Sequence, residues 1–540
     1  MRAIVWFILG LNATLFISSA QSDTHPADLI ITNGSLFVSG EVHPTHDSIA
    51  IHNGIIVGVF ENKDIQQYTS AMTRIIDVES KLVIPGIIDA HHHSIMSPGN
   101  IKRLSFDTLN PTKHQVATAI KDAVAKTAKG TWLYVSIGGR VIDDASINAA
   151  FLDALAPQHP VWLATYYGHG DVMNSLAMNG LNIGALPEAN DGGFYEQDTK
   201  GALTGRLYEY AHWVPKATMV NQLSDEVIID QLKTQAERAI KFGITSWHDM
   251  PMLKFDRYLQ LLEQAKLPVR VTAIPMPHIS VAKNTYLPSA KTINPKIIVQ
   301  GEKWILDGTP IERGAALSVD YLDQPNWRGR INFSADYIGK LLDGVIERNS
   351  QPLFHISGDR TLATLLTEME KRDVNWPDYR VRIEHGDGFN AALLQRAKKQ
   401  GIIVVQNPSH FMNKAIGTQR LPKNHPFMYF KTLIDHNIAL AIGSDGPMNP
   451  YLNMMFARIH AARPEEGIDV ASALQLYTSG SAYAGKQEAQ LGQIKTGMQA
   501  DLAVLSQNIL EVPLEELPNT TSVLTIVNGE IAYVDDDKLN

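Results

Sequence analysis

The apolar run Leu82-Val83-Ile84-Pro85-Gly86-Ile87-Ile88 leads directly into Asp89-Ala90-His91-His92-His93. In an extended strand, residues two apart point to the same face, so His91 and His93 face together and His92 faces away. Two imidazoles on one face at the end of a buried strand supply half of a divalent-metal site. For this pattern alone, three ordinary histidines are the simpler interpretation, so ligands from elsewhere in the chain have to complete the site.

Three further candidate ligands follow apolar segments that read as strands. These are His355 after Pro352-Leu353-Phe354, His385 after Val381-Arg382-Ile383-Glu384, and Asp445 after Ala441-Ile442-Gly443-Ser444. A (β/α)8 barrel uses roughly 30 residues per unit and keeps its chemistry at the C-terminal ends of its strands. His385 lies 30 residues after His355 and 60 before Asp445, and the strand required between the last two is present at 402–406. The spacing therefore predicts that these side chains meet at one end of a barrel.

The middle of the chain alternates predicted strands and helices, which is typical of a parallel sheet. We predict helices at 224–242, 335–349, 361–371 and 391–399, and strands at 351–355, 380–384, 402–406 and 438–442. The segment from about 104 to 213 is too long for a plain loop. We expect it to be an insertion that packs over the barrel mouth and shapes the substrate pocket.

Both ends of the chain read as short strands separated by turns. Asn33-Gly34, Asn53-Gly54 and Asn528-Gly529 are strong hairpin signals. Neither end has enough strands to close its own core. We therefore expect one small β domain, built from residues 27–84 and 486–540, beside a barrel domain spanning 85–485.

Composition excludes several classes of function. The 540 residues carry a net charge of -9 and no block of lysine or arginine, so nucleic-acid binding has no electrostatic support. The chain contains no cysteine, which excludes disulfides, thiolate ligands and a cysteine nucleophile. Histidine, carboxylate or a modified lysine must hold any metal, a donor set that suits zinc, manganese, iron or nickel.

The N-terminus is typical of an export signal. Arg2 precedes an apolar run at 3–17, and Ser18-Ser19-Ala20 offers small residues for cleavage after Ala20. The run is shorter than the roughly 20 residues that a membrane span needs. We predict that residues 1–20 are a signal peptide and that the protein is periplasmic or secreted, without stable membrane insertion after cleavage. An uncleaved anchor is the alternative.

Taken together, these motifs resemble the amidohydrolase superfamily. The similarity extends from about residue 28 to 534 and includes Leu491-Gly492-Gln493-Ile494-Lys495-Thr496-Gly497-Met498-Gln499-Ala500-Asp501-Leu502. Features of the predicted insertion resemble the YtcJ-like, or amidohydrolase-3, branch: Gly168-His169, Asn174-Ser175, Gly201-Ala202-Leu203-Thr204-Gly205 and Glu209. Each motif is short, and their specificity comes from occurring in the right order.

The resemblance implies a distorted (β/α)8 TIM barrel with a flanking β-sandwich. It implies one or two divalent ions, which we expect to be zinc. Lys303 matches the position that related enzymes carboxylate to bridge two metals, and His169 and Asn174 become candidate substrate contacts. Glu312 and Arg313 depart from the small-residue loop that the family has there. The implied metal ligands are His91, His93, Lys303, His355, His385 and Asp445.

This ligand set predicts hydrolytic chemistry on a small molecule. A divalent cation lowers the pKa of its bound water towards ~7 and polarises a carbonyl. Asp445 can take a proton from the water and return it to a leaving nitrogen. We therefore expect a metal-dependent hydrolase that cleaves a carbon–nitrogen bond of a non-peptide amide by attack of a metal-bound hydroxide. An ester or lactone hydrolase, or a catalytically silent binding or regulatory protein, are the alternatives.

Each candidate residue also has an ordinary structural interpretation. Lys303 could form an ion pair with Asp307 or Asp359, and His385 could merely donate to Glu384. Asp445 could be a turn or cap residue, while His169 and Asn174 could be plain loop residues. Whether the protein forms a homo-oligomer stays open.

Overall fold

The computed structural model describes residues 26–95, 101–183, 192–277, 287–423 and 425–539. The predicted signal peptide lies outside these residues. In the described part of the chain, no helix is long and apolar enough to cross a membrane.

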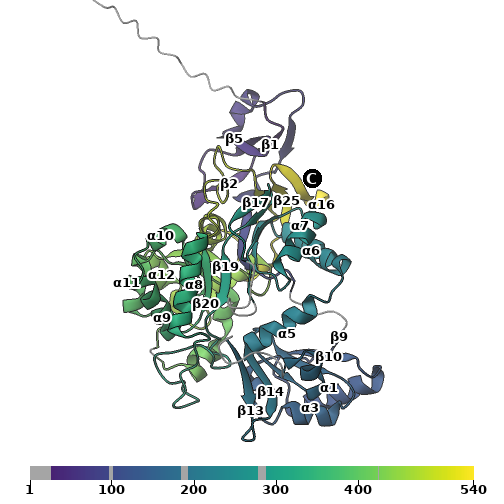
Figure 1. Cartoon of the computed structure of the whole chain (residues 1–540). Coiled ribbons are helices and arrows are strands. Elements are labelled where there is room, and N and C mark those ends of the chain that lie inside the picture. Colours follow the sequence, from purple (N-terminus) through teal and green to yellow (C-terminus); the bar gives the residue numbers. More distant parts are fainter. Residues whose placement is uncertain (1–25, 96–100, 184–191, 278–286, 424, 540) are drawn as a thin grey trace, which may run out of the picture.

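Strands from the two ends of the chain pack together. One sheet has the order β5 (Ile55–Phe60), β4 (Ser48–His52), β1 (Leu29–Thr32) and β6 (Arg74–Asp77). The other has the order β26 (Glu530–Val534), β25 (Ser522–Val527), β24 (Leu502–Leu505), β7 (Leu82–Pro85), β2 (Ser35–Val38) and β3 (Glu41–Val42). Apolar side chains of both sheets, among them Ile31, Val83 and Leu524, form one cluster. Figure 1 shows these purple and yellow strands together at the top of the molecule.

The middle of the chain contributes two further sheets that consist mainly of parallel strands. The first has the order β17 (Lys291–Asn294), β18 (Ile297–Val299), β16 (Arg270–Ala273), β15 (Ile244–Asp249) and β8 (Ile87–His92), with only β17 antiparallel to its neighbour. The second has the order β19 (Glu302–Ile305), β20 (Pro352–Ile356), β21 (Arg382–His385), β22 (Ile403–Gln406) and β23 (Ala439–Ile442), all parallel. The predicted strands at 351–355, 380–384, 402–406 and 438–442 are thus confirmed to within two residues.

Backbone contacts join these two sheets at both edges. The amide of Asp445, just after β23, donates to the carbonyl of His91 in β8 at 3.0 Å. At the other edge, the amide of Lys303 in β19 donates to the carbonyl of Pro275, just after β16, at 2.9 Å. Gly443 permits the first approach, because a Cβ there would collide with the backbone of His91. Residues far apart in sequence therefore lie side by side at the strand ends.

Helices alternate with these parallel strands. Serine caps start two of them, since the Ser224 hydroxyl accepts from the Val227 amide and the Ser334 hydroxyl from the Tyr337 amide. The helices predicted at 224–242, 335–349, 361–371 and 391–399 correspond to α6 (Asp225–Ile240), α8 (Ala335–Arg348), α9 (Asp359–Glu370) and α11 (Ala391–Lys399). The helices of this region are α6 (Asp225–Ile240), α7 (Phe255–Ala265), α8 (Ala335–Arg348), α9 (Asp359–Glu370), α10 (Trp376–Tyr379), α11 (Ala391–Lys399), α12 (Lys431–Asp435), α13 (Pro450–Ile459), α14 (Val470–Gln475) and α15 (Ser481–Ala484), and α16 (Asp536–Leu539) follows the last strand.

The region predicted as an insertion has a sheet of its own. Its order is β13 (Gly193–Gln197), β14 (Leu203–Glu209), β12 (Gly170–Met173), β11 (Val161–Thr165), β10 (Trp132–Ile137) and β9 (Ile101–Arg103). It carries α1 (Lys113–Lys126), α2 (Gly139–Asp143), α3 (Ala149–Leu155) and α4 (Ser175–Gly180), and α5 (Tyr210–Val220) follows it. Two apolar clusters belong to this region alone, and Figure 1 shows it at the opposite end of the molecule from the terminal strands. The exact domain limits remain predictions.

Candidate metal centre

His91 and His93 lie together at the end of β8, with their ring centroids 5.2 Å apart. The Nδ1 atom of His91 donates to Oε2 of Glu384 at 2.6 Å, and that of His93 donates to the carbonyl of Met250 at 2.7 Å. A carboxylate oxygen and a carbonyl oxygen both accept hydrogen bonds, so each imidazole carries its proton on Nδ1. The unprotonated Nε2 atom of each ring is therefore available to a metal.

His355 and His385 come from β20 and β21, and their ring centroids lie 4.4 Å apart. Nδ1 of His385 donates to Oδ1 of Asn407 at 2.7 Å, and the ring lies 5.1 Å from that of His91. Among the described residues, the buried Nε2 atom of His355 has no hydrogen-bond partner. A buried nitrogen without a partner is costly unless something else binds it. The four predicted histidines thus converge, and a metal would satisfy this nitrogen.

Asp445 lies between these histidines. One carboxylate oxygen lies 3.7 Å from Nε2 of His91 and 3.7 Å from Nε2 of His93, and the other lies 3.8 Å from Nδ1 of His385. Ligands about 2.1 Å from a tetrahedral metal are roughly 3.4 Å apart, so the first two distances match the spacing around an ion better than a direct hydrogen bond. Asp445 is not a helix cap, because Asn449 caps α13.

His410 joins Asp445 from the far side and was not predicted. It lies in a short helix, Pro408–Met412, just after β22, and its Nε2 atom lies 3.7 Å from the Asp445 carboxylate. His385, His410 and Asp445 therefore form a second group that could hold an ion, beside His91, His93 and Asp445. The signal that could have found His410 was its position just after a predicted strand.

Burial keeps these imidazoles neutral, which is the form that binds a metal. Burial lowers the pKa of His93 to about 3, and it lowers the pKa values of His91, His355 and His385 well below the usual range. For Asp445, burial raises the pKa to about 7, against the opposing charges of Lys303 and His169. A bound cation would favour the ionised carboxylate.

Lys303 is buried in β19 and faces the histidines, since its charge contributes to lowering the pKa of all four rings. Burial lowers the pKa of Lys303 itself to about 8. Neither proposed ion pair forms, because Asp307 accepts from Thr361 and the amide of Ser357, and Asp359 accepts from Ser318. Lys303 therefore lies near enough to the four rings for its charge to act on them, and it forms neither of the expected ion pairs.

His169 is brought to the metal centre by the insertion, whereas Asn174 is not. The His169 ring lies 4.6 Å from that of His355, and its Nδ1 atom donates to Glu209 at 3.1 Å. The Asn174 side chain accepts from the amides of Val161 and Ala177. Val161 begins β11, roughly 13 Å along the strand from Thr165, the residue beside the His169 loop. The expected substrate contact by Asn174 is therefore corrected: this residue caps α4 inside the insertion.

His169, Glu209 and Glu312 form a third group that could hold an ion. Its polar atoms already have partners, however. The Glu312 carboxylate accepts from the amide and the hydroxyl of Thr309, both at 2.5 Å, and Glu209 also accepts from Asn332 at 3.1 Å. The third group is satisfied without a metal, unlike the His355 nitrogen.

Buried charged residues hold His91 on the Nδ1 side of its ring. Glu384 accepts from Nε of Arg382 at 2.9 Å as well as from His91. Arg382 also donates to the carbonyl of Ala90 at 2.7 Å and to Nδ1 of His248 at 3.0 Å. Carboxylates that hold a metal-binding imidazole fix its orientation and raise its basicity. The sequence suggested Glu384 as a partner of His385, but the structure pairs it with His91.

Three residues of the site have backbones in the left-handed half of conformational space. The φ angles are +58° for Glu209, +69° for His385 and +35° for Asp445. Such angles cost of order 1–3 kcal/mol each for residues with a Cβ and concentrate at functional sites. The strain is consistent with a site whose side chains are held in place by their surroundings.

Comparisons with known proteins agree with this geometry. A sequence profile of the amidohydrolase family matches residues 74–533. Three relatives align over nearly the whole chain. LONG AFTER FAR-RED 3 of Arabidopsis thaliana is 27% identical, covering 97% of this chain and 95% of its own length. YtcJ of Bacillus subtilis, an amidohydrolase by name, is 25% identical over 93% and 98%. N-substituted formamide deformylase of Arthrobacter pascens is 22% identical over 94% and 99%.

A solved structure gives the same result for the fold. The metal-dependent hydrolase of Pyrococcus furiosus superposes with a TM-score of 0.67 at 21% identity, covering 89% of this chain and 100% of the other. This likeness implies a TIM-barrel-like α/β domain. The profile match over most of the chain shows that this protein belongs to the amidohydrolase family, with a centre suited to metal-dependent hydrolysis.

Proposed function

We propose that this protein hydrolyses a carbon–nitrogen bond of a non-peptide amide in a small molecule. The observation that supports it most is the convergence of the His91, His93 and His385 imidazoles on the Asp445 carboxylate, with hydrogen bonds from Nδ1 that leave Nε2 of each ring free for a metal. The relative named for deformylation of N-substituted formamides, 22% identical over 94% of this chain, supports an amide as the substrate.

Zinc is the metal that this donor set favours. Histidine nitrogens and carboxylate oxygens, with no thiolate, suit catalytic zinc. We propose that His91, His93 and Asp445 hold one ion, and that His355 and His385 hold a second if Lys303 becomes a bridging carbamate. When bound, the metal supplies Lewis-acid polarisation of a carbonyl and a lowered pKa for a coordinated water.

The chain's own residues supply positioning and proton transfer. Asp445 is held by its backbone hydrogen bond to His91, with its two oxygens directed to opposite sides of the site. From there it can accept a proton from water and deliver it to the leaving nitrogen. His169, held by Glu209, presents its ring beside His355 and can orient the substrate.

Two further features belong to the same proposal. We infer that the two parallel sheets are halves of one distorted barrel, supported by the backbone bonds that join them at both edges. The two sheets built from both chain ends would be its flanking β-sandwich. We also propose that the protein is exported after removal of residues 1–20.

The direct test measures metal content and turnover together. The zinc-loaded protein is assayed against matched N-formyl amides, esters and lactones, before and after chelation. We expect amide cleavage that chelation abolishes and zinc restores. The His385→Ala variant is expected to lose metal, whereas His114→Asn, which changes an exposed residue of α1, is expected to keep metal and turnover.

Three outcomes contradict the proposal. Turnover that survives thorough chelation would remove the metal from the mechanism. Faster cleavage of esters or lactones than of amides would make the protein an esterase or lactonase. Bound metal without turnover of any compound would favour a binding protein.

A further inference from the structure

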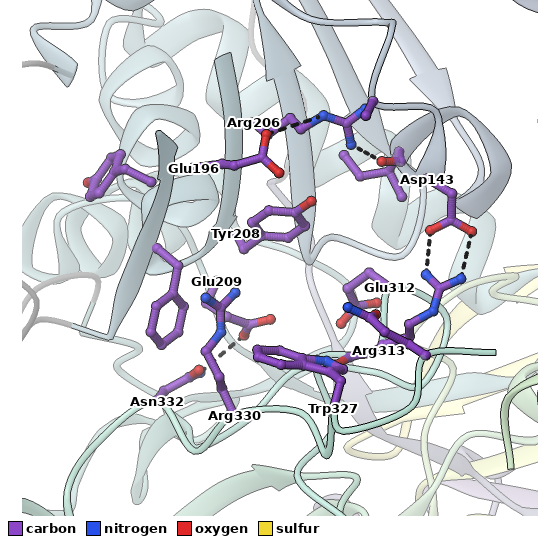
Figure 2. A pocket seen from close by; sticks show the side chains of 16 residues that line it. Asp143, Glu196, Arg206, Tyr208, Glu209, Glu312, Arg313, Trp327, Arg330 and Asn332 are labelled. Carbon is purple, nitrogen blue, oxygen red and sulfur yellow. Dashed lines mark hydrogen bonds and ion pairs between the residues drawn. The ribbon is translucent and has the colours of Figure 1, made fainter. Parts of the chain in front are cut away.

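A cavity of about 330 Å³ lies between the insertion and the segment 312–332. Strands β13 and β14 form one wall, and residues around Glu312 and Trp327 form the other (Figure 2). The segment includes Glu312 and Arg313, where the sequence departs from the small residues of the family. Glu312 and Arg313 both line the cavity.

Glu209 connects the cavity to the metal centre. Its carboxylate lines the cavity and also holds His169, whose ring lies 4.6 Å from that of His355. The Glu209–His169 pair thus separates the cavity from the histidines, and a substrate that occupies both sites has to pass beside this pair. Any group in the cavity lies several bonds away from the reacting carbonyl.

Arg330 is the cationic group of this cavity that remains free. Its guanidinium lies 3.6 Å from the ring centroid of Phe194, 5.6 Å from that of Trp327 and 5.7 Å from that of Tyr208. Among the described residues its guanidinium has no hydrogen bond or ion pair, although the nearby charges of Glu209 and Glu312 oppose the lowering of its pKa by burial; Figure 2 shows it beside Glu209. Aromatic stacking fixes the plane of the guanidinium while its N–H donors stay available, an arrangement suited to bidentate binding of a carboxylate.

The other two arginines of the cavity are already engaged. Arg313 forms ion pairs with Asp143 at 2.6 Å and with Asp323 at 2.7 Å. Arg206 donates to backbone carbonyls, including that of Ile147 at 3.3 Å. These two arginines connect the cavity walls, so among the three arginines it is Arg330 whose guanidinium donors are available to a ligand.

The acidic residues of the cavity do not leave uncompensated negative charge. Asp143 is paired with Arg313, and Glu196 lies 3.5 Å from Arg206. Glu209 is paired with His169. For Glu312, burial raises the pKa to about 7, which reduces its charge at neutral pH. A carboxylate that binds beside Arg330 therefore enters a cavity whose positive and negative charges nearly cancel.

We propose that this cavity binds a carboxylate at the end of the substrate opposite the scissile bond, through the guanidinium of Arg330. The preferred substrates are then amides whose nitrogen carries a chain ending in a carboxylate, as in N-acyl ω-amino acids. This inference rests on the proposed amide hydrolysis and names its substrate class.

The test compares two matched series with the zinc-loaded protein. One series is N-formyl ω-amino acids with two to six carbons, and the other is N-formyl alkylamines of the same lengths. We expect kcat/KM to favour the carboxylates, with an optimum at one chain length. In Arg330→Gln, we expect KM for the best carboxylate to rise roughly 30- to 100-fold, since a charged hydrogen-bonded pair is lost, while the alkylamides are unaffected. Arg330→Lys is expected to lose less.

Arg328→Gln is the matched control, because Arg328 lies in the same segment, pairs with Asp320 and is not among the cavity residues. It should leave both series unchanged. If the wild type cleaves both series equally, or if Arg330→Gln and Arg330→Lys lower kcat for both series alike, the carboxylate pocket is wrong although amide hydrolysis stands. If the wild type cleaves neither series, and no uncharged amide of the broader panel either, the proposed function itself fails.

Discussion

Two buried histidine–carboxylate pairs in this protein have the same local geometry and very different surroundings. In the strand sheets, Nδ1 of His91 donates to Glu384 at 2.6 Å, and in the insertion, Nδ1 of His212 donates to Asp171 at 2.8 Å. The Nε2 atom of His91 faces Asp445, whereas that of His212 has no partner among the described residues and its ring lies 4.9 Å from that of Trp213. An oriented imidazole is therefore not sufficient for a metal site, which requires further ligands converging on the same point.

The largest effect is expected from Asp445→Asn. The amide keeps the shape of the carboxylate but cannot take a proton from water, so we expect kcat to fall roughly 10²- to 10⁴-fold. Metal content, measured by elemental analysis, should be largely retained. Near-normal turnover would show that Asp445 is not the general base.

Glu384→Gln tests the His91–Glu384 pair at the metal centre. It removes the charge that orients His91, and loss of such a carboxylate typically weakens metal binding 10- to 100-fold. Competition with a zinc chelator measures this affinity. An unchanged affinity would mean that His91 does not hold the metal.

Asp171→Asn is the matching change in the insertion. It removes the charge that His212 faces, and because both residues are fully buried we expect a loss of about 1–3 kcal/mol of unfolding free energy. Denaturant titration measures the loss, and the zinc affinity should stay as in the wild type. A drop in zinc affinity as large as that of Glu384→Gln would break the distinction between the two pairs.

The smallest effect is expected where the insertion is tied to its neighbours. Arg420 pairs with Asp323 and, at 2.7 Å, with Asp143, the two carboxylates that Arg313 also contacts. These side chains are partly exposed, so Arg420→Gln should cost at most about 1 kcal/mol, and less at high salt. A salt-independent loss of several kcal/mol of unfolding free energy would show that these paired arginines and aspartates contribute more to stability than a surface cluster does.

The sequence was most informative where strand ends carry candidate ligands. The convergence of His91, His355 and His385 was predictable because apolar runs and regular spacing place them at neighbouring strand ends. His410 was missed because it lies beyond the strand, in a short helix whose direction local pattern does not reveal. The alternative in which His385 merely donates to Glu384 was wrong, since only the tertiary fold determines that Glu384 faces His91 in β8.

The insertion was less predictable for a related reason. Its limits stay a prediction, and Asn174 looked like a substrate contact although its side chain caps α4. Cap and contact use the same polar residue types, and burial distinguishes them only in three dimensions. The role that we propose for Arg330 likewise depends on Phe194 and Trp327, which no local motif connects to it.

The sheet shared by the two chain ends has a consequence for synthesis. β7 pairs with β24, more than four hundred residues later, and β7 continues almost directly into the strand that carries His91. Until the last segments have left the ribosome, β7 lacks one neighbour and exposes an apolar edge. Contacts this distant slow folding, so the nascent polypeptide would benefit from a chaperone that covers this edge until translation ends.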